Sequence, residues 1–314
     1  MTDIITVTAN PALDLSTEAP ALVPDQKLRC SAPRIQPGGG GVNVSRAIAA
    51  LGGASRMLVA YGGHTGEGLI ALLRAEGLDP EGLGVGHPTR QSMSVRESSS
   101  GLNYRFMIPG LPWTESDCEA AREAIRTAIR PGALVIPSGS FPPGLPFDFF
   151  LNLNAEVVAQ GGRMLIDTSG PALDRAARGG DGLFTLRMDT VEAEELARRQ
   201  LHSLEDMAEM AARLRRSGAA EIVMIAAGAS GTVIACEGWL GLTRPPVVVP
   251  HSLIGAGDSF IGAFALSISR GDDPVTACCW GTAAAASAVT RPGTDLCVKS
   301  DVDRFFAQVT RHAL

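Results

Sequence analysis

The chain contains the stretch Ile254-Gly255-Ala256-Gly257-Asp258-Ser259-Phe260-Ile261-Gly262-Ala263-Phe264. A β-type run, Pro246-Val247-Val248-Val249, precedes it, and its apolar residues then recur at helical spacing. The sequence therefore predicts a strand, a glycine turn and a helix. Small residues in the turn allow backbone N–H groups to point at one place, where the helix N-terminus adds partial positive charge. Such a turn suits a phosphate whose charge changes during a reaction.

Asp258 stands at the mouth of this predicted anion hole. A carboxylate is badly placed there to bind an anion, but it is well placed to take a proton from a hydroxyl group that attacks the anion. The same residues also fit an ordinary turn in which Asp258 or Ser259 caps the helix. The stretch alone leaves both interpretations open.

Composition narrows the class of protein. The 314 residues include 27 Lys and Arg against 33 Asp and Glu, and the net charge of −6 carries no basic stripe that would suit nucleic acid. The N-terminus does not resemble a signal peptide, and no segment is apolar enough to span a membrane. Six cysteines lack zinc-site spacing, and adjacent Cys278 and Cys279 suit free thiols. We therefore expect a cytoplasmic protein that binds neither nucleic acid nor membrane.

Strand and helix patterns alternate along most of the chain, which predicts an α/β fold with a doubly wound, mostly parallel sheet. The length allows one large domain or two small ones. Expected strands cover residues 4–8, 55–61, 133–137, 163–166, 183–186 and 221–227, followed by a hairpin from 231 to 239. Expected helices cover residues 65–76, 114–129, 147–160, 203–218, 274–290 and 301–311.

Polar residues follow the strand ends, where ligands bind in open α/β sheets. They lie at positions 14, 38–43, 140, 189–192, 228–231 and 255–258. Segments 10–36 and 88–110 interrupt the alternation, and we expect them to form a small lid sheet. Lys27–Cys30 predicts a short edge strand, and Gln91–Glu97 with Leu102–Met107 predicts a hairpin.

Several residues in these segments suit ligand binding, and each also has a structural interpretation. Four glycines, Gly38–Gly41, lead into an apolar helix and allow a ligand to approach the backbone, although they also fit a hinge. Asn43 offers an amide or a plain N-cap. Arg90 and Arg105 suit phosphate, but surface charge is the more common role of a single arginine. Asp14 suits a ligand or a turn cap.

Together these motifs resemble the PfkB/ribokinase family of carbohydrate kinases over essentially the whole chain. Thr8–Asp14 is similar to the N-terminal signature of the family, Gly38–Gly53 to its first fingerprint, and Ile254–Phe264 to its second. The chain is most similar to the sugar-phosphate kinases of the family. The resemblance implies one ribokinase-like domain over residues 1–314, with a mostly parallel sheet between helices and a small β-sheet lid.

The implied activity is ATP-dependent phosphorylation of a ketohexose phosphate, with fructose 6-phosphate converted to fructose 1,6-bisphosphate as the favoured reaction. Tagatose-6-phosphate kinase and 1-phosphofructokinase activities remain alternatives, because sugars that differ at one hydroxyl change only a contact or two. A non-catalytic sugar-phosphate sensor is the alternative from another class. The intact Asp258 and anion hole argue against a sensor.

The resemblance also implies roles for individual residues. Asp258 would be the base, and the anion hole would comprise Gly255, Ala256 and Gly257. Residues that would bind the sugar phosphate are Asp14, Lys27, Gly38, Gly39, Asn43, Arg90, Arg105 and Ser140. Residues that would bind ATP are Arg187, Asp189, Gly228 and Gly231. Residues that would bind a monovalent cation such as K⁺ are Ser252, Ile254, Ala288, Arg291 and Gly293.

One segment departs from the family pattern. The Lys-Pro-Asn-x-x-Glu of the family is replaced by Arg187-Met188-Asp189-Thr190-Val191-Glu192. Asp189 adds a negative charge near the expected phosphates, and we expect it to share a hydrated Mg²⁺ with Glu192. The alternative is that Asp189 only caps the following helix.

The predicted lid has too little apolar surface to be stable alone, so we expect a homodimer joined through it. Its apolar residues that would need a partner are Leu22, Val23, Leu28, Met93, Val95 and Phe106.

Overall fold

Strand β1 (Ile4–Thr8) is buried along its whole length in the computed structural model, which describes residues 2–314. Its alternate residues pack on opposite sides of a sheet: Ile4 joins one apolar cluster, whereas Ile5 and Val7 join another. A strand with two apolar faces must be covered by helices on both sides.

The large sheet has ten strands, in the order β14-β13-β12-β11-β10-β9-β8-β1-β4-β5. Pairing is parallel from β11 to β5 and antiparallel from β11 to β14. This arrangement confirms the predicted mostly parallel, doubly wound sheet. The remaining strand bounds are β4 (Arg56–Val59), β5 (Glu81–Gly82), β8 (Leu134–Pro137), β9 (Arg163–Asp167), β10 (Thr185–Asp189), β11 (Ile222–Ala226), β12 (Thr232–Cys236), β13 (Trp239–Arg244) and β14 (Thr310–Ala313).

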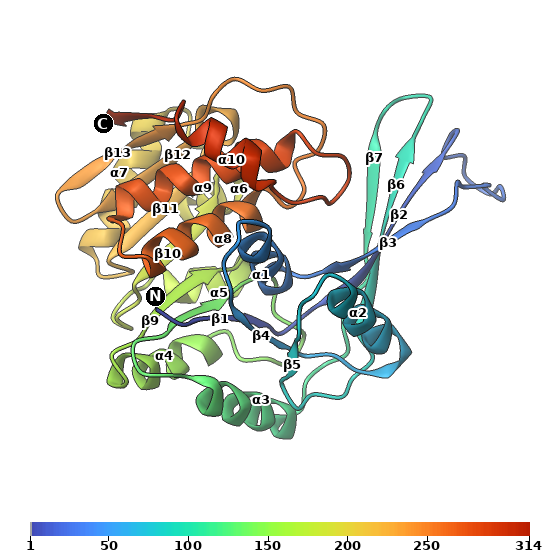
Figure 1. Cartoon of the computed structure of the whole chain (residues 1–314), viewed down its shortest axis with the longest axis horizontal. Helices are drawn as coiled ribbons and strands as arrows, with labels where there is room; N and C mark the ends of the chain where they lie inside the picture. The colour runs from blue at the N-terminus through green and yellow to red at the C-terminus, as the bar shows by residue number, and fades with distance from the viewer. Residues whose placement is uncertain (1) are drawn as a thin grey trace.

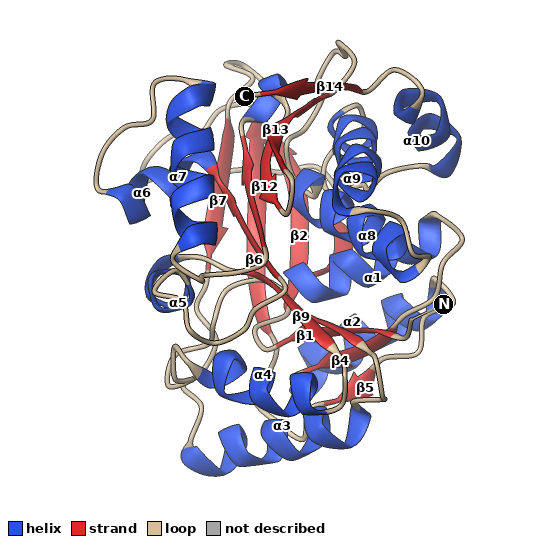
Figure 2. Cartoon of the chain, turned by 90° about the vertical axis from the view of Figure 1, so that its left-hand side faces the viewer, coloured by secondary structure: helices blue, strands red, loops and turns tan. Residues whose placement is uncertain are grey.

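Helices cover the two faces of this sheet in separate groups (Figure 2). One group comprises α1 (Gly40–Ala50), α8 (Ala256–Ser269), α9 (Pro274–Val289) and α10 (Lys299–Phe306). The other comprises α3 (Glu115–Ala128), α4 (Phe149–Ala159), α5 (Gly170–Ala176), α6 (Thr190–Ala197) and α7 (Leu204–Arg216). Helix α2 (Gly63–Ala75) packs with β2 (Ala12–Ala19) and β4 in a third, smaller cluster. Within residues 2–314, no helix combines the length and apolar character needed to cross a bilayer.

A second sheet of four strands projects from one end of the molecule, at the upper right of Figure 1. We call this sheet the lid. Its order is β3-β2-β6-β7, with β2 (Ala12–Ala19), β3 (Arg34–Gly38), β6 (Arg90–Glu97) and β7 (Asn103–Met107). Strands β2, β6 and β7 lie within the two segments predicted to form the lid, whereas β3 begins in the first segment and extends two residues beyond it, to Gly38. The predicted hairpin joins β6 to β7.

The register of the lid separates its polar and apolar residues. Asp14 pairs with Gln36 and with Ser92, so these three side chains share one face. The next row belongs to the opposite face and comprises Ile35, Leu15, Met93 and Phe106. The lid is therefore amphipathic, with its candidate ligand-binding residues on the polar face.

Four local predictions were wrong. Pro246–Val249 forms no strand: Val247 and Val249 are 104% and 77% exposed, and the adjacent prolines cannot donate ladder hydrogen bonds. Lys27–Cys30 is also irregular and exposed. The predicted last helix ends at Phe306, and residues 310–313 instead extend the sheet as β14. Finally, β10 covers residues 185–189 rather than 183–186.

Candidate active site

The predicted turn and helix at residues 255–264 are present. Gly255 is the N-cap of α8, with a left-handed backbone (φ 77°), and a Cβ there would lie 2.8 Å from Leu296 Cδ2. No side chain caps this helix, so the alternative in which Asp258 or Ser259 is a cap is wrong. The first turn of a helix leaves N–H groups without intrahelical partners. Those of Ala256 and Gly257 belong to this turn, as the anion-hole interpretation requires.

Asp258 is half-buried in the first turn of α8 and contacts a polar network on α1. Asn43 Nδ2 donates to Asp258 Oδ2 at 2.9 Å, and Arg46 Nη1 donates to Asn43 Oδ1 at 3.2 Å. Burial raises the pKa of Asp258 to about 7, and the charge of Asp167 adds to this rise. The hydrogen bond from Asn43 opposes it. A carboxylate with a pKa near neutrality is suited to act as a base.

Arg187 extends from β10 toward the same turn. A Cβ placed on Gly257 would lie 3.1 Å from Arg187 Nη2, so the guanidinium lies directly against the anion hole. Arg187 Nη1 donates to Asp167 Oδ1 at 3.0 Å, and both side chains are largely buried. The sequence predicted a nucleotide-side role for Arg187 but gave Asp167 no role. The sequence pattern that could have identified Asp167 is its position directly after an apolar strand, since Asp14 was selected as a candidate for the same reason.

Asp189 and Glu192 form a reciprocal capping box at the start of α6. Asp189 Oδ1 accepts from the Glu192 N–H at 2.9 Å, and Glu192 Oε2 accepts from the Asp189 N–H at 2.7 Å. The helix-capping alternative for Asp189 is thus what the structure shows. Burial raises the pKa of Glu192 to about 7. Each carboxylate keeps a second oxygen outside the capping box, and residues 2–314 contain no cluster of three metal-binding side chains.

On the lid, Asp14 lies over the glycine-rich turn: a Cβ on Gly38 would overlap Asp14 Oδ2. Arg90 Nη1 donates to Ser92 Oγ at 3.0 Å, and Arg90 Nε donates to the Asn10 carbonyl at 3.4 Å. Burial raises the pKa of Asp14, whereas the positive charges of Arg90 and Arg105 oppose that rise. The structure therefore places Asp14, Arg90 and Arg105 near one another on the polar face of the lid.

The glycine-rich turn passes close to the loop after β8. A Cβ on Gly40 would lie 2.4 Å from Ser138 Oγ, which leaves no room for a side chain. Gly39 has a φ of 115°, a conformation that glycine adopts readily. Asn10 Nδ2 donates to Ser140 Oγ at 3.1 Å, so Ser140 also lies at this edge of the sheet.

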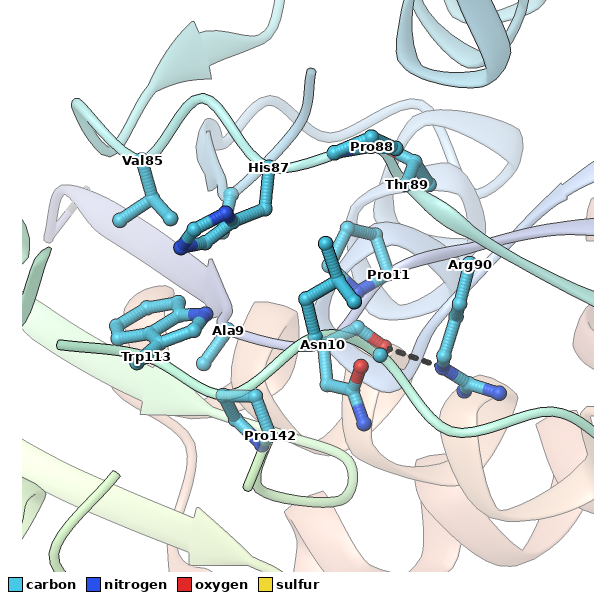
Figure 3. A pocket seen from close by; sticks show the side chains of 13 residues that line it. Ala9, Asn10, Pro11, Val85, His87, Pro88, Thr89, Arg90, Trp113 and Pro142 are labelled. Carbon is cyan, nitrogen blue, oxygen red and sulfur yellow. Dashed lines mark hydrogen bonds between the residues drawn. The ribbon is translucent and has the colours of Figure 1, made fainter. Parts of the chain in front are cut away.

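A small pocket of about 20 Å³ adjoins these residues (Figure 3). Arg90 and Asn10 line one part of it, and His87 and Trp113 line another. His87 Nε2 lies 3.0 Å from Asp117 Oδ2, which links the pocket to the N-terminus of α3. The sequence prediction missed His87, because its partner is distant in sequence.

The remaining predicted residues lie in three places. Lys27 is exposed between β2 and β3, and within residues 2–314 its side chain has no hydrogen bond or ion pair. Gly228 and Gly231 lie at the turn (Gly228–Ser230) between β11 and β12. The predicted cation-binding residues come from the loop before α8 and from the end of α9 with the loop that follows it. Ser252 Oγ donates to the Gly293 carbonyl at 2.6 Å, and the Arg291 N–H donates to the Ala288 carbonyl of α9 at 2.9 Å. Ile254 is joined to the first loop, because its N–H donates to Ser252 Oγ at 3.2 Å.

Comparison with protein families finds that residues 5–301 match the family described as pfkB family carbohydrate kinase. The chain is 35% identical to "ATP-dependent 6-phosphofructokinase isozyme 2" of Escherichia coli over 312 residues, or 99% of this chain and 100% of that one. It is also 35% identical to the protein of the same name from Mycobacterium tuberculosis, over 96% of this chain and 88% of that one. A 1-phosphofructokinase from Xanthomonas campestris is 29% identical over 84% of this chain and 83% of that one.

Among solved structures, phosphofructokinase-2 from E. coli in complex with fructose-6-phosphate matches with a TM-score of 0.90 and 34% identity. The match covers 98% of this chain and 99% of the E. coli chain. Other structures of the E. coli protein are described as a complex with potassium and as a tetrameric inhibited form.

Proposed function

The chain belongs to the pfkB family of carbohydrate kinases, and from that premise we propose that it transfers the γ-phosphoryl group of ATP to fructose 6-phosphate, giving fructose 1,6-bisphosphate. The observation that carries the proposal is a half-buried carboxylate with a raised pKa, Asp258, in the first turn of a helix that begins with a glycine turn. Full-length similarity to 6-phosphofructokinases supports the choice of sugar.

In the proposed reaction, Asp258 takes the proton from the 1-hydroxyl group as that oxygen attacks the phosphoryl group. Asn43 orients the carboxylate through its hydrogen bond. N–H groups of Ala256 and Gly257, with the guanidinium of Arg187, stabilise the charge that spreads over the transferred oxygens. Phosphoryl transfer depends mainly on such positioning and charge neutralisation.

We assign the 6-phosphate to Arg90 and Arg105 on the polar face of the lid, since charge-assisted hydrogen bonds to phosphate are strong. Asp14, Gly38, Gly39 and Ser140 would contact the sugar, with Asn43 beside its reactive hydroxyl. Lys27 would join them only if the segment between β2 and β3 folded over the site.

ATP would bind along Gly228 and Gly231, with its phosphates toward Arg187 and Asp189. Mg²⁺, which is usually held by one or two carboxylates, phosphates and waters, would neutralise their charge. The fit is reasonable, because Asp189 and Glu192 each keep one oxygen outside the capping box. A K⁺ ion would use the loops that contain Ser252 and Gly293, and the potassium complex of the E. coli relative supports this assignment.

We also propose a homodimer joined through the lid. The row Ile35, Leu15, Met93 and Phe106 forms an apolar stripe, and Ile35, Met93 and Phe106 are 46%, 39% and 47% exposed. Val95 needs no partner, because it is only 4% exposed within the chain. Six free cysteines among the described residues support a cytoplasmic location.

A substrate panel tests the proposed function. Purified protein is assayed with ATP and Mg²⁺ against fructose 6-phosphate, tagatose 6-phosphate, fructose 1-phosphate and free fructose. We expect the highest kcat/KM with fructose 6-phosphate and at least about 100-fold less with free fructose, because the lid arginines would lose their charge-assisted bonds. A higher kcat/KM with tagatose 6-phosphate or fructose 1-phosphate would instead identify one of the two alternative kinases.

A further inference from the structure

Asp167 lies between the two halves of the site and contacts both. It ends β9, and its carboxylate is 14% exposed. Oδ1 accepts from Arg187 Nη1 at 3.0 Å, and Oδ2 accepts from Ser138 Oγ at 3.2 Å. Its backbone carbonyl also accepts from the Gly139 N–H at 3.0 Å. One residue therefore connects the arginine at the anion hole to the loop that carries Ser140.

The Arg187 guanidinium depends on Asp167 for its orientation. Asp167 is its ion-pair partner, and the buried Nε of Arg187 has no hydrogen-bond partner among residues 2–314. An arginine side chain is long and flexible, so a single charge-assisted bond at Nη1 decides where Nη2 points. In this structure the guanidinium lies against Gly257, and a Cβ there would be 3.1 Å from Nη2 and 3.2 Å from Nη1.

Asp167 also contributes to the charge balance around Asp258. The groups that face Asp258 are Asn43 and Arg46 on α1, Arg187 on β10 and Asp167 on β9. Asn43, Arg46 and Arg187 favour the ionised form of Asp258 and so lower its pKa, whereas the negative charge of Asp167 disfavours that form and raises the pKa. With Asp167 neutral, Arg187 would stabilise the Asp258 anion without compensation and make it a weaker base.

We propose that Asp167 is a positioning residue for phosphoryl transfer: it holds the Arg187 guanidinium against the anion hole and supplies a negative charge that balances the positive charge beside Asp258. This inference rests on the proposed kinase function. It assigns Asp167 a role through Arg187 and Asp258, and no contact of its own with the substrates.

The test is Asp167→Asn, since asparagine keeps the shape, accepts from Arg187 and donates to Ser138. We expect kcat with fructose 6-phosphate to fall about 10- to 100-fold, because a neutral hydrogen bond holds the Arg187 guanidinium less firmly than the charge-assisted one does. KM for the sugar should change less than about threefold, and the acidic limb of the kcat/KM profile should move to lower pH. Asp181→Asn is the matched control, because Asp181 pairs with Arg175 at 2.8 and 3.0 Å and takes no part in the site.

Two further variants test the inference if thermal melting shows that Asp167→Asn folds poorly. Asp167→Glu restores the charge and should return the acidic limb to its wild-type position even if kcat stays low. Arg187→Lys combined with Asp167→Asn should lower kcat less than the product of the single effects, because both act on one pair. An unmoved acidic limb in Asp167→Asn, or strictly multiplicative losses, would overturn the proposal. Absence of wild-type activity on fructose 6-phosphate would instead refute the proposed function.

Discussion

Asp258 combines two properties at the scale of a single residue: its carboxylate is shielded from water by the surrounding protein, and it accepts a hydrogen bond from Asn43. Burial favours the protonated form and the hydrogen bond favours the ionised form, and burial dominates. The resulting pKa of about 7 means that the group gains and loses its proton near physiological pH. Both the identity of the base and its pKa can be tested.

Asp258→Asn should lower kcat by about two to four orders of magnitude while leaving fructose 6-phosphate binding nearly unchanged. Asparagine can still accept the hydrogen bond from Asn43, so the turn should keep its geometry. Steady-state kinetics and calorimetric titration with the sugar phosphate measure the two quantities. Near-native kcat in this variant would show that another group is the base.

The wild-type enzyme should lose activity as the pH falls through about 7. The raised pKa of Asp258 makes its ionised, basic form scarce below that value, so log kcat/KM should decline with a slope near one. A profile of kcat/KM between pH 5.5 and 9 provides the measurement, with stability checked at each pH. A flat profile down to pH 5.5 contradicts the assignment of this pKa to the base.

At the scale of elements, the N-terminus of α6 combines a structural role with a proposed binding role. Asp189 and Glu192 satisfy each other's backbone N–H groups and so stabilise the start of the helix. Because this helix follows β10, the same carboxylates lie at the strand ends where ATP is expected. A substitution that keeps the cap but removes the charge can separate the two roles.

Asp189→Asn is that substitution, since asparagine caps helices about as well as aspartate. We expect the concentration of free Mg²⁺ that gives half-maximal activity at fixed MgATP to fall or the titration curve to flatten, because one negative charge near the phosphates is removed. Thermal melting should show a change in unfolding temperature of at most a few degrees. If the Mg²⁺ titration is unchanged, Asp189 acts only as a helix cap.

At the scale of the whole molecule, the lid is joined to the body through charged and polar side chains. Arg34 Nη2 on β3 lies 2.5 Å from Asp295 Oδ1, and Gln36 Oε1 on the same strand accepts from Thr294 Oγ1. The loop that contains Thr294 and Asp295 continues to Leu296, which packs beside Gly255. The same loop thus contacts both the lid and the residue that begins the anion hole.

The apolar face of the lid predicts the assembly state. Phe106→Asp places a charge in the exposed apolar stripe, and we expect the mass measured by light scattering to fall from dimer to monomer. Val158→Asp, at a 50% exposed position on α4, is the matched control and should leave the dimer intact. A monomeric, fully active wild-type protein would contradict a dimer formed through the lid.

Sequence reasoning found the features that local patterns encode. The glycine turn before α8, the helix α3 and the lid hairpin each depend on residues close in the chain, and all three were predicted. The pairing of Asp167 with Arg187 could not be predicted, because it depends on β9 lying beside β10. The strand predicted at Pro246–Val249 is absent. β-branched residues favour a strand, but proline has no backbone N–H group to donate to a neighbouring strand.

The strict alternation of the lid constrains how its length can change in evolution. Strands β2 and β6 pair without interruption from Ala12 with Arg90 to Ala19 with Glu97. A single inserted or deleted residue in either strand would reverse every later side chain, exchanging the ligand-binding face with the apolar one. Substitutions can thus alter sugar recognition and subunit contact independently, whereas an insertion of odd length disrupts both at once. Length variation among functional homologues should therefore be confined to the loops that join the lid strands.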